Sequence, residues 1–316
     1  RAEVGGWARL AGLIAGWRLP EEADRQLALA IPGTIESPAW IGAADERAVW
    51  DDFVAARKAR AAGLFAQARA LAAEHGRVPT REELARPAGE RPALTQRSCE
   101  VVRLLHRTLR DDPDHERARA ALGWTRHGTA WVWPETARRL DRGEEFDAAF
   151  GWLPAGRLAR YRAGERYDRG RWIPAAVEAA RTDLAVDRGR RFDSDHWEIL
   201  STAPLEAAAA LAARLETTRV VWRQVFGAFG IEPSDLEKRL GGRGRIPALE
   251  PCAAVLCADR GQYVRELEKL EPAIGRTDGL YWTPTQTAWF FSGPPAGMEE
   301  PPPRTLTVHH EATHQL

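Results

Sequence analysis

The sequence predicts an α+β protein in which a helical region and a small repeat module precede a domain built on a mixed sheet. Three observations support this fold class. Amphipathic helical patterns begin near residue 45, prolines recur every twenty residues in the middle of the chain, and short apolar strands alternate with helices towards its end. We therefore divide the chain into residues 1–44, 45–123, 124–189 and 190–316, and assign no structure to the first of these segments.

The helical region comprises residues 45–123. A long helix is predicted to begin at Asp45, which can cap it, and to bury Leu64 and Phe65. A second amphipathic helix covers residues 96–109. Residues 109–123 resemble half of a tetratricopeptide repeat, and ordinary packing of a helical hairpin is the alternative explanation of this stretch.

The repeat module is marked by Pro134, Pro154 and Pro174. Each copy is predicted to contain a strand, a proline turn and a short helix, which is too little chain to bury an apolar face without its neighbours. A tryptophan stands next to or near each proline, and equivalent places are predicted for Trp133, Trp152 and Trp172. Two interpretations of these tryptophans stay open, because they can form the core of the module or an exposed surface that binds carbohydrate.

Strands and helices alternate in residues 190–316, in the order β-α-β-α-β-β-α. This order predicts a mixed sheet. The predicted elements are a strand at 195–201, a helix at 204–229, a strand at 253–256, a helix at 259–270, a hairpin of 281–282 with 287–291, and a last helix starting at Pro303 or Arg304.

Composition excludes several classes of protein. Acidic and basic residues number 45 each, which argues against a nucleic-acid-binding surface or a basic membrane patch. No apolar run is long enough to span a membrane. Cys252 and Cys257 are five residues apart on a predicted strand, so they point to opposite faces and no disulfide is expected between them. The compartment stays open, with a preference for an extracytoplasmic location, and the oligomeric state is not predicted.

The strongest functional signal is an H-E-x-x-H motif formed by His310, Glu311 and His314. On a helix, residues i and i+4 lie on one side, so both imidazoles can bind a single Zn²⁺ ion while Glu311 serves as the general base beside the metal-bound water. The alternative is a surface helix with two solvated histidines. His309 lies about 100° around the helix from His310, so we expect it to pack rather than bind metal.

The stretch TVHHEATHQL and the strand TAWFF resemble gluzincin-type, peptidase MA-like domains. The resemblance is closest to a bacterial family of uncharacterised function in which the motif reads HEATHQL, and the stretches DPDHERARAALGW and GRWIPAAVEAAR resemble its upstream regions. It implies a zincin-like fold, zinc ligation by His310 and His314, and a catalytic base in Glu311. It also implies a glutamate ligand downstream of the motif. Because no residue follows Leu316 and the chain starts at Arg1, we expect a fragment that ends after the motif helix and is inactive.

The expected substrate is a peptide or protein. Thr287, Ala288 and Trp289 are predicted to lie in an edge strand that holds an extended peptide by main-chain pairing. If the third zinc ligand instead lies upstream of the motif, Asp278, Glu299 and Glu300 are the candidates. The alternative to a peptidase is a non-catalytic scaffold that binds a peptide or a carbohydrate through a peptidase-like domain.

Overall fold

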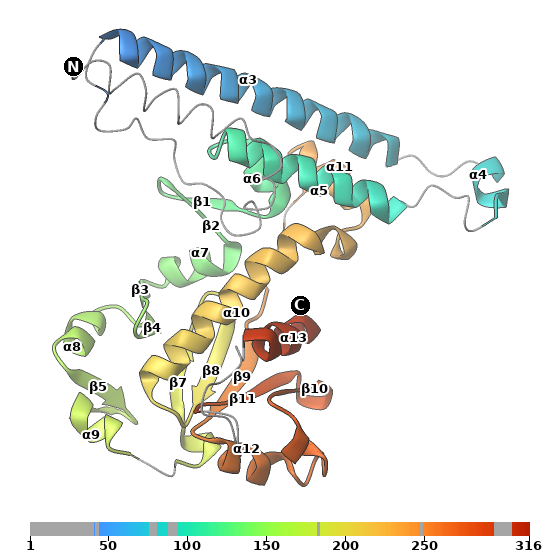
Figure 1. Ribbon diagram of the computed structural model, residues 1–316. Coiled ribbons are helices and arrows are strands. Elements are labelled where there is room, and N and C mark those ends of the chain that lie inside the picture. Colours follow the sequence, from blue (N-terminus) through green and yellow to red (C-terminus); the bar gives the residue numbers. More distant parts are fainter. Residues whose placement is uncertain are drawn as a thin grey trace, which may run out of the picture. The chain divides into compact units, whose positions relative to one another are not determined.

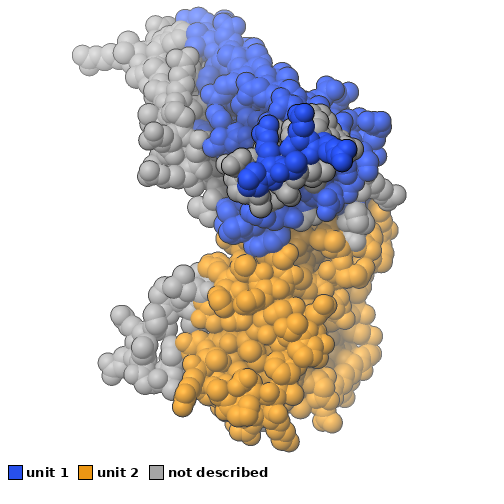
Figure 2. Space-filling model, turned by 90° about the vertical axis from the view of Figure 1, so that its right-hand side faces the viewer, with its two compact units in different colours: residues 1–131, 220–246 blue, residues 132–219, 247–316 orange. Residues whose placement is uncertain are grey.

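The computed structural model describes residues 41, 44–75, 81–87, 94–181, 184–244, 246, 249–293 and 305–316 (Figure 1). The chain forms two compact units (Figure 2). The first unit contains residues 1–131 and 220–246, and the second contains residues 132–219 and 247–316. The sequence interpretation of most of residues 1–44, and of Glu299 and Glu300 as metal ligands, lies outside the described residues.

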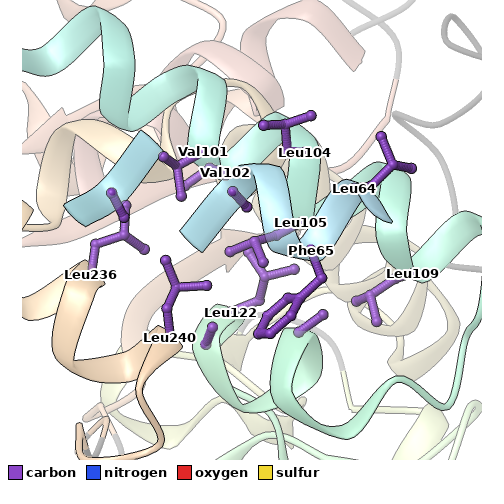
Figure 3. Close-up of a cluster of buried hydrophobic side chains, with 14 of the residues drawn as sticks. Leu64, Phe65, Val101, Val102, Leu104, Leu105, Leu109, Leu122, Leu236 and Leu240 are labelled. Atoms are coloured by element: carbon purple, nitrogen blue, oxygen red, sulfur yellow. The ribbon is translucent and has the colours of Figure 1, made fainter. Parts of the chain in front are cut away.

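Helices build the first unit. Its long helix α3 (Ala44–His75) packs on α5 (Leu94–Asp111), as the apolar pattern predicts. The same unit contains the shorter α4 (Arg81–Ala85), α6 (Glu116–Leu122), η3 (Gly227–Gly230) and α11 (Pro233–Leu240). Leu64, Phe65 and Leu105 lie in one buried cluster with Leu236 and Leu240 of α11 (Figure 3). Residues 220–246 belong with the N-terminal helices, because the apolar side of α11 fills this core. The sequence division had placed them with residues 190–316.

The twenty-residue repeat is a β-hairpin followed by a short helix. Its three copies are β1 (Thr125–His127), β2 (Ala130–Val132) and α7 (Pro134–Asp141); β3 (Glu145–Asp147), β4 (Gly151–Leu153) and α8 (Leu158–Arg162); and β5 (Glu165–Asp168), β6 (Arg171–Pro174) and α9 (Ala175–Ala179). Each copy thus has two strands where the sequence pattern indicated one. The predicted equivalence of the tryptophans is wrong for Trp133, which precedes α7 as its N-cap, whereas Trp152 and Trp172 lie in the second strands of their hairpins.

A five-stranded mixed sheet organises the second unit, with the order β10-β11-β9-β8-β7. The strands are β7 (Arg190–Asp193), β8 (Trp197–Ser201), β9 (Cys252–Cys257), β10 (Leu280–Trp282) and β11 (Thr287–Phe291). β8, β9 and β11 run parallel, and the two outer strands pair antiparallel with their neighbours. The expected α+β class and mixed sheet are therefore confirmed, but β7 was not predicted from the sequence.

Helices cover both faces of this sheet. α10 (Leu205–Val225) and α13 (Thr305–Gln315) contribute to the core on one face, and α12 (Arg260–Leu267) contributes to the core on the other. Alternation along β9 fits this arrangement, because Ala254 and Leu256 join the first core while Val255 and Cys257 join the second. Cys252 and Cys257 contact opposite cores and are both free thiols, as their spacing predicts. Short 3₁₀ turns complete the unit at Val186–Arg188, Ile274–Arg276 and Thr283–Thr285.

Candidate functional site

The motif residues lie on α13, and burial of one side of this helix orients them. Val308 and Ala312 are 5% and 0% exposed and join the core formed with α10 and the sheet. His310 follows Val308 by two residues and His314 follows Ala312 by two, and both histidines lie on the exposed side of the helix. The packing of Val308 and Ala312 therefore presents both histidines to solvent, since residues spaced by four share a face.

The two imidazoles point towards each other. Their Nε2 atoms are 3.3 Å apart, and the ring planes are close to perpendicular. Two nitrogen ligands at about 2.0–2.1 Å from one tetrahedral zinc ion lie roughly 3.3–3.4 Å from each other. The separation of these donors therefore matches that of two nitrogen ligands on one zinc ion. The same distance also fits a direct hydrogen bond between the rings, which requires a proton on one of the two Nε2 atoms.

Tyr281 of the edge strand β10 contacts both Glu311 and His314. Its backbone N–H donates to Glu311 Oε2 over 2.7 Å, and its ring is parallel to the ring of His314, with centroids 5.9 Å apart and planes 6° from parallel. Glu311 is half-buried, and Tyr281 N is the only hydrogen-bond donor to its carboxylate among the described residues. One strand residue thus fixes the carboxylate and supports the second histidine.

Gln315 attaches the last turn of α13 to the sheet. Its Oε1 accepts a hydrogen bond from Trp197 Nε1 over 3.0 Å, and its Nε2 donates to the carbonyls of Ala253 at 2.8 Å and Gln286 at 3.2 Å. This anchor was missed in the sequence interpretation, because nothing in the order His-Gln-Leu shows which strands the amide will reach. It limits movement of His314, the residue directly before it.

His309 takes no part in the pair. Its Nδ1 lies 2.5 Å from Thr218 Oγ1 of α10, so this ring is held between the two helices. The expectation that His309 packs instead of binding metal agrees with this contact.

Zinc would have two protein ligands here among the described residues. In the part of the chain that the structure describes, no group of three or more His, Cys, Asp or Glu side chains is arranged to hold a metal. Asp278, a candidate for an upstream ligand, pairs instead with Arg260 at 2.9 Å. Catalytic zinc sites use three protein ligands. The two donors are spaced as zinc ligands are, and the described residues bring no third ligand to them.

The predicted substrate strand has a different place in the sheet. β11 pairs with β10 on one side and with β9 on the other, so the backbone of Thr287, Ala288 and Trp289 is already hydrogen-bonded within the sheet. Ala288 is 0% exposed. The expectation that this strand forms the edge is wrong, because β10, which the sequence analysis placed in a hairpin with it, pairs on its outer side.

The tryptophans of the repeat module offer no open platform for a sugar. Trp152 is buried, and Trp133 and Trp172 are half-buried. Guanidinium groups also cover two of the rings, with Arg139 5.8 Å from the ring centroid of Trp152 and Arg160 3.8 Å from that of Trp172. The burial favours the core interpretation, because a sugar stacks on an exposed ring face.

Two further observations bear on function. None of the described helices has the length and apolar character needed to cross a membrane. Comparisons of the chain with family models, with curated proteins and with solved structures find no match.

Proposed function

We propose that the second unit carries a zinc metallopeptidase site of the gluzincin type, with His310 and His314 as metal ligands and Glu311 as the general base. The observation that supports this most directly is the 3.3 Å separation of the two Nε2 atoms, which equals the spacing of two nitrogen ligands on one zinc ion. Glu311 follows His310 on the same helix and presents a carboxylate beside the pair, as this chemistry requires.

Each oxygen of the Glu311 carboxylate has its own role in this proposal. Oε2 is tethered by the N–H of Tyr281, which fixes the plane of the carboxylate. Oε1 then takes the proton of the attacking water and returns it to the amine that leaves. Zinc, when bound, lowers the pKa of its water towards about 7 and polarises the substrate carbonyl. The substrate class that fits is an extended peptide, because β10 is the outermost strand of the sheet among the described residues and Tyr281 places it beside Glu311.

Zinc binding to the chain is the first test. Isothermal titration with ZnCl₂ is expected to show weak binding to the wild-type protein and loss of that binding in His310→Ala and in His314→Ala. His309→Ala is the matched control, because this neighbouring histidine contacts Thr218 and lies outside the pair. Zinc binding that survives both site variants, or that depends on His309, would exclude the proposed ligands.

The base is tested separately from the metal. Glu311→Gln keeps both imidazoles and an acceptor oxygen for Tyr281 N, so zinc binding should match the wild type. In a form of the protein that supplies a third zinc ligand, the same substitution should abolish zinc-dependent cleavage of a peptide library. Cleavage by the full protein that persists in Glu311→Gln would refute the role of Glu311. Equal zinc affinity of the two chains, with no cleavage by a three-ligand form that retains Glu311, would support the metal site and refute the peptidase assignment.

A further inference from the structure

A buried polar cluster of the second unit contains none of the motif residues. It is formed by Glu135 of α7, by His196, which directly precedes β8, and by Glu216 and Arg219 of α10. Glu135, His196 and Arg219 are 8%, 5% and 6% exposed. Polar atoms of side chains buried to this extent normally all have hydrogen-bond partners, so any atom that has none requires an explanation.

Glu216 holds one edge of the His196 ring. Its Oε1 accepts hydrogen bonds from the backbone N–H of His196 at 2.8 Å and from Ser194 Oγ at 2.7 Å, and its Oε2 lies 2.6 Å from His196 Nδ1. Burial alone would raise the pKa of Glu216, but the hydrogen bonds from His196 and Ser194 lower it, so this carboxylate is ionised. An ionised carboxylate only accepts hydrogen bonds, and His196 Nδ1 therefore carries a proton and donates.

The opposite edge of the ring faces polar atoms that are not satisfied. His196 Nε2 lies 3.9 Å from Glu135 Oε1, and Arg219 Nη2 lies 3.6 Å from the same oxygen. Both distances are too long for a direct hydrogen bond. His196 Nε2, Glu135 Oε2, and Nε and Nη2 of Arg219 are buried without a hydrogen-bond partner among the described residues. Unsatisfied atoms from three chain segments thus meet at one carboxylate.

The charges around this point restrict the group that can connect these atoms. The guanidinium of Arg219 disfavours a metal ion, and the carboxylates of Glu135 and Glu216 disfavour an anion. A neutral molecule that both donates and accepts suits the cluster, because it can accept from Arg219, donate to Glu135 and pair with either tautomer at His196 Nε2. Water has these properties, and it bridges polar groups separated by more than about 3.5 Å.

We propose that an internal water molecule lies at this point and hydrogen-bonds to His196 Nε2, to the Glu135 carboxylate and to Arg219. About three hydrogen bonds are typical of a buried water. Because its partners belong to α7, to the residue before β8 and to α10, the water attaches the helix of the first repeat copy to the sheet and to α10. The inference does not rest on the metallopeptidase assignment, since it uses neither the motif residues nor a metal.

A high-resolution crystal structure of the full chain tests the site directly. The expected result is one ordered oxygen about 2.6–3.2 Å from His196 Nε2, from a Glu135 oxygen and from an Arg219 nitrogen. An empty site, or direct hydrogen bonds from His196 and Arg219 to Glu135 with no water between them, would overturn the proposal. A metal ion, recognised by donor distances of about 2.0–2.2 Å, would overturn it as well.

Oxygen-17 magnetic relaxation counts the long-lived internal waters in solution. Glu135→Met replaces the carboxylate by an apolar side chain of similar length, so this variant should lose one such water relative to the wild type. Glu145→Met is the matched control, because Glu145 is an exposed carboxylate of β3 in the same repeat module. Equal water counts in the two variants would contradict the site. The crystal structure of the wild type decides the question even if Glu135→Met does not fold.

Discussion

Gly279 lets the motif helix approach β10, and its replacement by alanine is the sharpest test of the site geometry. A Cβ atom at this position would lie 2.8 Å from Thr307 Cγ2 and 3.3 Å from Glu311 Cγ. Contacts this short force α13 away from the strand or turn the side chain of Thr307. Overpacking of this kind costs roughly 1–3 kcal/mol of unfolding free energy. Because the same displacement lengthens the 2.7 Å hydrogen bond from Tyr281 N to Glu311 Oε2, it also disturbs the proposed base.

Urea unfolding followed by tryptophan fluorescence measures this cost. Gly275→Ala is the matched control, because a Cβ there meets no atom within 4 Å in the same segment of chain. The variant Thr307→Ser removes the methyl group in the closest contact, so Gly279→Ala combined with Thr307→Ser should recover most of the loss. Two results would refute the reasoning: equal stability of Gly279→Ala and Gly275→Ala, or no coupling between Gly279→Ala and Thr307→Ser in the double-mutant cycle.

Two further predictions concern stability. Gln315→Leu should lower the unfolding free energy by about 1–3 kcal/mol, because it leaves the indole N–H of the fully buried Trp197 without its acceptor. A change in the urea midpoint no larger than that of the surface variant Arg162→Gln would contradict this. Burial, together with the charge of Arg223, lowers the pKa of His106 from 6.5 to about 4, so the neutral ring is favoured in the folded state. The first unit should therefore be fully stable above about pH 6.5 and lose up to roughly 3 kcal/mol as the pH falls through 4, and His106→Leu should flatten this slope of the unfolding free energy.

The sequence predicted those parts of the fold that local patterns determine. The apolar spacing located α3 and α5, the strand–helix alternation located β8, β9, β11 and α12, and the motif located α13 with both histidines on one side. These features follow from the 3.6-residue and two-residue periods of the chain. The proline spacing likewise located the repeat, although the first strand of each hairpin carries too few apolar residues to give a pattern.

Features that depend on tertiary contacts could not be read in this way. The order of strands in a sheet is set by pairing between distant segments, and this is why β11 was expected at the edge and β10 is found there. The contribution of Tyr281 to the site is made partly by its backbone N–H, a group that every residue other than proline has, so no side-chain pattern marks it. α11 belongs to the first unit because Leu236 and Leu240 pack in a core whose other residues are distant in sequence.

The packing of α13 also separates the structural residues of the site from the functional ones. Val308, Ala312, Gly279 and Gln315 place the helix, and these residues are buried or make close contacts with the sheet. His310 and His314 are exposed, and substitutions of exposed residues usually change stability by less than about 0.5 kcal/mol, to which His314 adds its ring contact with Tyr281. The burial of Val308 and Ala312 and the four-residue spacing therefore orient both histidines towards the same side of the helix. It follows that histidine variants should change zinc affinity with little change in stability, whereas Gly279→Ala should change stability first. Coupled loss of stability and zinc binding in His310→Ala would instead mean that the ring contributes to the fold.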